Sequence, residues 1–113
     1  MQYIALIYWD EASPEHVPED VIEQYGVYTQ DIIARGKFKA GDALQPTDTA
    51  TCIRIRDGKR RVIDGPFAET KEQLGGYYLL ECDNLDDAIE TAAGIPTAKY
   101  GTIEVRPIRI YGD

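Results

Sequence analysis

The sequence predicts a single α+β domain, residues 1–113, in which two helices cover one face of an antiparallel sheet. Short apolar segments rich in β-branched and aromatic residues alternate with two segments whose apolar residues recur every three or four positions. A further pair of short alternating segments flanks an Asp-Gly turn, which is typical of a β-hairpin. With this hairpin set aside, the order strand–helix–strand, strand–helix–strand indicates a ferredoxin-like βαββαβ fold with an inserted β-hairpin.

The first strand and the first helix are expected over residues 2–9 and 18–36. Residues 2–9 are almost wholly apolar, which favours a central strand. Pro18 and the acidic residues after it are typical of a helix start, and Arg35-Gly36 is typical of a helix end. Gly26 within this helix would permit close approach by a strand. The expected buried stripe consists of Val21, Ile22, Tyr25, Tyr28, Thr29, Ile32 and Ile33.

Four more strands and one loop are predicted in the middle of the chain. Residues 37–42 form the second strand of the main sheet, and residues 43–50 form a loop. Residues 51–56 and 59–63 form the hairpin around Asp57-Gly58. Residues 64–66 break the hairpin, with Gly65 at positive φ, and residues 75–82 form a buried strand. The pair Gly75 and Gly76 indicates a bulge or a close backbone approach at the start of that strand.

The second helix and the last strand complete the predicted fold. Asp83 or Asn84 can cap the helix, and Gly94 with Pro96 ends it. Residues 102–110 alternate apolar and polar side chains as a final strand, in which Pro107 favours an edge or the strand's end. The expected apolar stripe of the helix consists of Leu85, Ala88, Ile89, Ala92 and Ala93.

The face of the sheet away from the helices also has to be covered. Residues 77–80 are Tyr-Tyr-Leu-Leu and show no polar alternation. We therefore expect a twofold homodimer in which two sheets pack face to face. The alternative is that the hairpin and the loops cover this face within one chain.

The composition excludes several kinds of partner. The chain carries 12 Lys and Arg residues against 20 Asp and Glu residues, a net charge of −8, so direct binding of nucleic acid or of a membrane is not expected. The basic run at residues 59–61 is expected to protect a sheet edge. No membrane span or signal peptide is recognisable, which favours a cytoplasmic protein. Cys52 and Cys82 are expected as buried thiols, and with one histidine neither a metal site nor another cofactor is expected.

One stretch has an unusual composition and carries a family resemblance. Residues 64–77 read Asp-Gly-Pro-Phe-Ala-Glu-Thr-Lys-Glu-Gln-Leu-Gly-Gly-Tyr. Together with Gly41, residues 44–46 (Leu-Gln-Pro) and residues 105–107 (Val-Arg-Pro), this stretch resembles the DGPF branch of the YCII-related family over essentially the whole chain. The resemblance implies a ferredoxin-like dimer with a cleft, of the dimeric α/β-barrel type. It also implies an association with extracytoplasmic-function sigma factors, because members of this branch are often encoded near them.

The family resemblance also bears on the catalytic residues. The broader family is associated with a histidine on the first helix and a nearby aspartate, proposed as an acid/base pair. In this chain the expected histidine position holds Tyr25, and the only histidine, His16, lies in the preceding loop. A tyrosine, with an ordinary pKa of about 10, is a poor general base but can donate a hydrogen bond or act as an acid. Plain core packing is the alternative for Tyr25, with the carboxylate of Asp42, Glu69 or Glu72 as the partner of its hydroxyl.

Further candidate residues are carboxylates and one lysine. Asp42 or Asp64 would act as the base, although turn formation is the alternative for Asp64 and solvent exposure for Asp42. Glu69, Lys71 and Glu72 would bind the ligand, with Lys71 holding an anionic or carbonyl group; the alternative is a surface turn with weak ion pairs. Phe67, in the same stretch, is expected in the core.

Three functional hypotheses remain open from the sequence. The first is a dimeric small-molecule-binding domain with cofactor-independent acid/base activity, lyase- or isomerase-like, on a small polar or aromatic metabolite. The second is a non-catalytic regulatory module that acts through a protein partner in sigma-factor-controlled transcription. The third is a structural dimer without a ligand.

Overall fold

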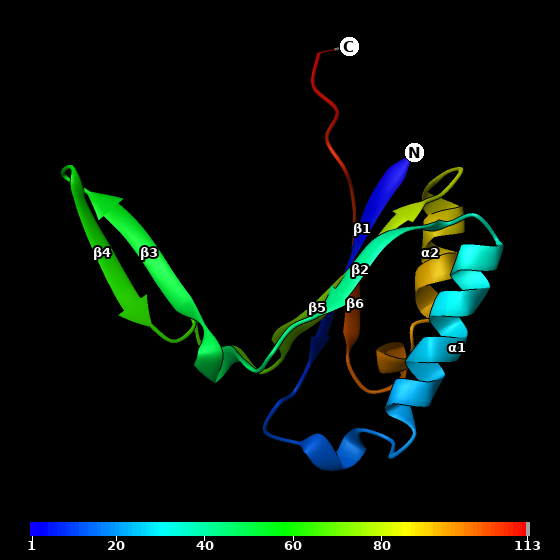
Figure 1. Ribbon diagram of the computed structural model, residues 1–113, viewed down its shortest axis with the longest axis horizontal. Helices are drawn as coiled ribbons and strands as arrows, with labels where there is room; N and C mark the ends of the chain where they lie inside the picture. Colours follow the sequence, from blue (N-terminus) through cyan, green and yellow to red (C-terminus); the bar gives the residue numbers. More distant parts are fainter. Residues whose placement is uncertain (113) are drawn as a thin grey trace.

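The main sheet has the strand order of a ferredoxin-like fold. The computed structural model describes residues 1–112, so the last residue of the predicted domain, Asp113, lies outside the described residues. The sheet order is β2-β5-β1-β6, and all three strand pairs are antiparallel. Both helices lie on one face of this sheet (Figure 1), which confirms the predicted α+β class. The strands and helices are β1 Gln2–Trp9, α1 Val21–Ala34, β2 Phe38–Ala43, β5 Gln73–Glu81, α2 Leu85–Ala93 and β6 Thr102–Pro107.

The core lies between the helices and one face of the sheet. Alternate residues of β1 are buried, as expected for a strand with one covered face. Tyr28 and Ile32 of α1 and Ala88 and Ala92 of α2 pack against this face. The sheet contributes Tyr3, Ala5, Ile7, Tyr78 and Leu80 to the same cluster.

The buried stripes of both helices are narrower than expected. Ile22 and Ile33 of α1 are 86% and 47% exposed, and Leu85 and Ile89 of α2 are 50% and 52% exposed. Each helix contacts only one flat surface, so residues at the margins of its apolar stripe remain in solvent. A Cβ at Gly26 would meet nothing within 4 Å, so no strand approaches α1 there, contrary to expectation.

The predicted end of α1 and the predicted cap of α2 agree with the structure, whereas α1 begins at Val21 and not at the predicted Pro18. Gly36, after the last turn of α1, has a φ of +71°. The side chain of Asn84 accepts a hydrogen bond of 2.9 Å from the backbone N–H of Asp87 and caps α2. Neither helix has the length and apolar character needed to cross a lipid bilayer.

The hairpin is a separate two-stranded sheet. It consists of β3 Thr51–Arg56 and β4 Lys59–Asp64. Asp57 and Gly58 have φ angles of 54° and 73°, as the predicted type I′ turn requires. The hairpin stands away from the main sheet on the side opposite the helices (Figure 1). The hairpin therefore does not cover the open sheet face within one chain, contrary to that part of the alternative.

Two details of the middle and end of the chain differ from expectation. Phe67, in the segment that returns from β4 to β5, is 81% exposed and does not join the core, because this segment accompanies the detached hairpin. Strand β6 ends at Pro107, before the predicted residue 110, because proline cannot donate to a ladder. Cys82 is buried as predicted, whereas Cys52 is only partly buried.

Candidate active-site cavity

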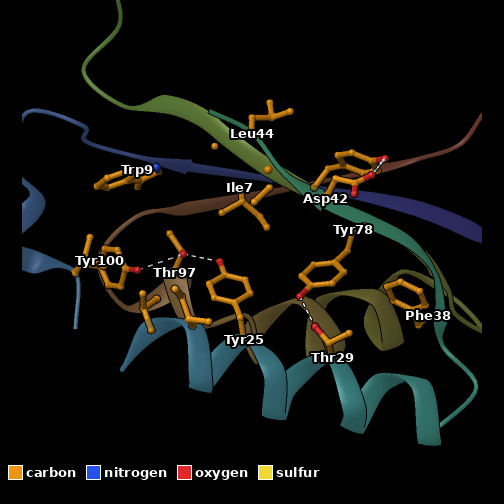
Figure 2. Close-up of a pocket in the computed structure, with 18 residues that line it drawn as sticks. Ile7, Trp9, Tyr25, Thr29, Phe38, Asp42, Leu44, Tyr78, Thr97 and Tyr100 are labelled. Carbon is orange, nitrogen blue, oxygen red and sulfur yellow. Dashed lines mark hydrogen bonds between the residues drawn. The ribbon is translucent and has the colours of Figure 1, made fainter. Parts of the chain in front are cut away.

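A cavity of about 520 Å³ lies between the N-terminal half of α1 and the sheet. We call it the α1 cavity. Val21, Tyr25 and Thr29 of the helix line one side of the cavity, and residues of strands β1, β2 and β5 line the other (Figure 2). Farther along α1, Tyr28 and Ile32 are buried against the core. The cavity therefore forms where the helix no longer packs directly on the strands.

Glycines in the sheet allow aromatic rings to lie flat against the cavity floor. A Cβ at Gly41 would come within 2.6 Å of Cδ1 of Tyr78, its cross-strand neighbour. A Cβ at Gly75 would come within 2.7 Å of Nε1 of Trp9. The register of β1 and β5 also shifts between Ile7 and Tyr8, which leaves Gly75 unpaired. The expected bulge and close approach at Gly75 are thus confirmed.

A row of three hydroxyl groups forms one wall of the cavity. The hydroxyl of Tyr25 lies 2.5 Å from Oγ1 of Thr97, which lies 3.4 Å from the hydroxyl of Tyr100 (Figure 2). Thr97 and Tyr100 belong to the short 3₁₀ segment Pro96–Lys99 and its cap, where residues three apart face the same way. Thr97 is only 4% exposed, so the shared oxygen is fixed in position.

Tyr78 forms an aromatic wall at the other end. Its ring stacks on Tyr25 at 6.4 Å between ring centroids and meets Tyr28 and Phe38 edge-on at 5.4 and 6.3 Å. The Tyr78 hydroxyl lies 2.7 Å from Oγ1 of Thr29 on α1. These contacts hold the ring in place and make this wall rigid.

Burial sets the protonation state of the tyrosines. Desolvation raises the pKa of Tyr25, and the hydrogen bond with Thr97 opposes this rise only in part. Desolvation also raises the pKa of Tyr78. Both phenols therefore remain protonated near neutral pH, so each keeps a proton that it can donate to a hydrogen bond, and neither acts as a base.

Asp42 reaches the edge of the cavity, but its carboxylate is directed elsewhere. Oδ2 of Asp42 accepts a 3.0 Å hydrogen bond from the hydroxyl of Tyr77, and this contact raises the pKa of Tyr77. Tyr77 precedes the helix-facing Tyr78, so its side chain lies on the opposite face of the sheet. Figure 2 shows Asp42 directed away from Tyr25. The partner of the Tyr25 hydroxyl is therefore Thr97 and not Asp42.

The other candidate residues do not line the cavity in a single chain. Asp64 is exposed at the end of β4, next to Gly65, which has a φ of +97° as predicted and donates to the carbonyl of Ala50 at 2.7 Å. Glu72 accepts a 2.7 Å hydrogen bond from the hydroxyl of Thr102. Glu69 and Lys71 are exposed. The structure thus brings Tyr25 and the backbone of Asp42 to one cavity and leaves Asp64, Glu69, Lys71 and Glu72 outside it.

Several cavity residues were not recognised from the sequence. Thr97 and Tyr100 carry no motif, and only their spacing of three after Pro96 hints at a shared face. Trp9 and Tyr78 read as ordinary strand residues. His16 is exposed in the short segment Pro14–His16, as expected for a loop histidine. Within residues 1–112, no group of three or more His, Cys, Asp or Glu side chains is arranged to hold a metal ion.

Comparison with known proteins decides the family. The model of the YCII-related domain matches residues 1–110. The chain belongs to the YCII-related family. This YCII-related chain is also similar to "Uncharacterized protein R00369" of Rhizobium meliloti (strain 1021). The two chains are 38% identical over 117 residues, which cover 98% of this chain and 94% of the relative. The family resemblance based on residues 64–77 is thereby confirmed at the level of the family.

Proposed function

We propose that this YCII-related protein is a homodimeric small-molecule-binding domain whose ligand occupies the α1 cavity. The observation that carries the proposal is the row formed by Tyr25, Thr97 and Tyr100 on the wall of a cavity of about 520 Å³. Ligand sites typically measure about 300–1,000 Å³ and combine apolar walls with a few fixed polar groups. The α1 cavity has both properties.

The wall chemistry favours a neutral, flat ligand. Trp9, Phe38 and Tyr78 offer aromatic surfaces, and the polar groups beside them are hydroxyls. No Lys or Arg side chain is among the described residues that line the cavity, so an anion would find no opposite charge there. A small polar or aromatic metabolite with a hydroxyl or carbonyl group fits this wall.

Acid/base catalysis without a metal or an organic cofactor is a finer part of the proposal. Tyr25 would donate a proton or a hydrogen bond in a lyase- or isomerase-like reaction. Asp42 would serve as the base only if its carboxylate left Tyr77 and turned around the edge strand β2. Asp64, Glu69, Lys71 and Glu72 would contribute only if a partner subunit brought them to the cavity. Binding is therefore supported more directly than proton transfer.

Saturation-transfer NMR with phenol as the probe tests the binding site. Phenol should bind more strongly than benzoate, because the cavity offers hydroxyl groups and no positive charge. Tyr25→Phe should weaken phenol binding by about fivefold, the equivalent of one hydrogen bond. The matched control is Tyr111→Phe, which removes the hydroxyl of a tyrosine that is 82% exposed.

Two results would contradict this assignment of the site. One is a preference for benzoate over phenol. The other is that the unsubstituted chain, Tyr25→Phe and the control Tyr111→Phe all bind phenol with the same affinity.

The proposed dimer rests on the open face of the sheet. Ile4 and Leu6 of β1 alternate with buried residues and therefore lie on this face, and Leu79 is the cross-strand neighbour of Ile4. Neither helix covers these apolar side chains, and the hairpin stands away from them (Figure 1). A second copy that packs sheet to sheet would remove them from water.

A second candidate function is a non-catalytic interaction module, which the 81% exposure of Phe67 favours. A photo-crosslinking amino acid placed at position 67 tests it in cells. Crosslinks to a different protein, such as a transcription factor, would support this candidate. Crosslinks only to a second copy of the chain, or none at all, would count against it.

A further inference from the structure

The β3–β4 hairpin has one mainly apolar face and one mainly basic face. Ile53 lies directly opposite Val62, and Ile55 follows on the same face opposite Arg60. Ile53, Val62 and Ile55 are 64%, 58% and 66% exposed. The other face pairs Arg54 with Arg61 and Arg56 with Lys59, and Ile63 lies at its base beside Cys52. The hairpin is therefore amphipathic although neither face is covered within the chain.

An isolated two-stranded hairpin is only marginally stable in water. A hairpin with three exposed branched aliphatic side chains on one face needs a surface on which that face can pack. The helices lie on the far side of the sheet from the hairpin (Figure 1). A surface for Ile53, Ile55 and Val62 must then come from outside this chain.

Charge indicates that this surface is a second copy of the chain. The hairpin carries five of the 12 Lys and Arg residues but only two of the 20 Asp and Glu residues. The rest of the chain therefore carries seven basic against eighteen acidic residues. A basic hairpin is attracted to the acidic remainder of another copy, and in a twofold dimer both hairpins make this contact at once.

The position of the hairpin makes the contact geometrically feasible. The hairpin and the open face of the main sheet lie on the same side of the molecule, opposite the helices (Figure 1). A copy that covers Ile4, Leu6 and Leu79 would thus come within reach of the hairpin. We propose that the β3–β4 hairpin is a dimerisation arm whose Ile53, Ile55 and Val62 face packs on the partner subunit, and this inference rests on the proposed homodimer.

Sedimentation velocity over a range of concentrations tests the arm. The double variant Ile53→Ser/Ile55→Ser should raise the dissociation constant of the dimer by at least about tenfold, because the arm loses its apolar contact. The matched control is Ile63→Ser, which alters the basic face of the same hairpin and should change the constant by less than about threefold. Raising the salt concentration should also weaken the dimer, because screening reduces the attraction of the basic arm.

A shortened chain provides a second test that does not depend on hairpin folding. Deletion of residues 51–64 joins Ala50 to Gly65, whose backbone groups already share a 2.7 Å hydrogen bond. The shortened chain should also dissociate at least about tenfold more readily. Circular dichroism checks that the main sheet and the helices remain folded.

Three results would overturn the arm, and they differ in what they say about the dimer. A chain that stays monomeric at every concentration removes both the dimer and the arm. A dimer that Ile53→Ser/Ile55→Ser leaves unchanged, but that Leu79→Glu dissociates, removes the arm alone. If the hairpin variants leave the dimer unchanged and the chain binds a 20-nucleotide DNA through Arg54 and Arg61, the hairpin is a nucleic-acid-binding element instead.

Discussion

At the scale of single residues, Thr97 connects the parts of the cavity wall. Its side-chain oxygen lies within hydrogen-bond reach of two tyrosine hydroxyls, one from α1 and one from its own 3₁₀ segment. Thr97 and Tyr25 are 72 positions apart in the chain, so this contact depends on the assembled fold. The hydroxyl row is thus a product of tertiary structure and not of a local motif.

Replacing Thr97 by valine keeps the shape of the side chain and removes the shared oxygen. The hydroxyl of Tyr25 then loses its partner in a partly buried place, and we expect the free energy of unfolding to fall by about 1 kcal/mol. Urea denaturation followed by circular dichroism measures this change. Thr51→Val, in an exposed strand position, should alter stability by less than about 0.5 kcal/mol; equal effects of the two substitutions would contradict the role of the row.

Substitution by alanine should change the free energy of unfolding in opposite directions at two glycines. Gly41→Ala places a Cβ against the Tyr78 ring and near the carbonyl of Tyr77, so we expect a loss of about 1–3 kcal/mol and weaker phenol binding. Gly26→Ala adds a methyl group in open space on a helix and should stabilise the chain by about 0.5–1 kcal/mol. Thermal unfolding of both variants checks the pair, and a stabilising Gly41→Ala would show that the cavity floor is not closely packed.

At the scale of elements, an ion pair joins the end of α1 to α2. Nζ of Lys37 lies 2.9 and 2.7 Å from the two carboxylate oxygens of Asp87, and both side chains are largely buried. The hydrogen bonds from Lys37 lower the pKa of Asp87 below its ordinary value of 3.8, and the same contact raises the pKa of Lys37. The ion pair therefore stabilises the fold fully between pH 3.8 and 10.5, the ordinary pKa values of the two groups. This contribution is lost as the pH falls through the lowered pKa of Asp87 or rises through the raised pKa of Lys37.

The sign of the pH dependence follows from the lowered pKa of Asp87. Its contribution is fully present above 3.8 and is lost as the pH falls through the lower value of the folded state. Asp87→Asn should therefore make unfolding less dependent on pH in the acid range, as measured by urea denaturation at a series of pH values. Asp31→Asn, at the exposed pair with Arg35, is the control and should leave the acid dependence nearly unchanged. An unchanged profile for Asp87→Asn would contradict the role of the ion pair.

Most elements were predictable from local sequence, because their signals are local. The Asp57-Gly58 turn, the Asn84 cap and Gly36 each need only a few neighbouring residues to act. Burial was harder to predict, because apolar periodicity does not say how wide a surface each helix meets. Ile22 is apolar but exposed for this reason, and Phe67 is exposed because its segment accompanies the detached hairpin. The candidate site was predictable only at Tyr25 and at the backbone of Asp42, since Thr97 and Tyr100 reach the cavity through long-range packing.

At the scale of the whole molecule, the uncovered surfaces lie on one side. The helices close one face of the sheet, and the open face and the hairpin leave apolar side chains on the other (Figure 1). The radius of gyration is 16.2 Å, compared with roughly 13 Å for a compact domain of this length. The projecting hairpin accounts for this difference, as expected for a chain that completes its packing with a partner.

A charge placed on the open face should separate the proposed dimer. Leu79→Glu introduces a carboxylate at the centre of this face, and we expect a shift toward monomer in sedimentation velocity because an unpaired charge would be buried. Ile89→Glu, at a residue of α2 that is 52% exposed, is the matched control and should remain dimeric. A dimer that tolerates Leu79→Glu but not Ile89→Glu would place the interface on the helices instead.

The central claim is that the α1 cavity binds a small neutral molecule through Tyr25. A titration of the isotope-labelled chain with phenol, followed by amide chemical shifts in NMR spectra, tests it most directly. We predict that the largest shifts occur at Gly41, Gly76 and Thr97, and that Tyr25→Phe requires about fivefold more phenol to produce them. Shifts confined to the hairpin or to the open sheet face, with the same phenol dependence in Tyr25→Phe, would contradict the claim.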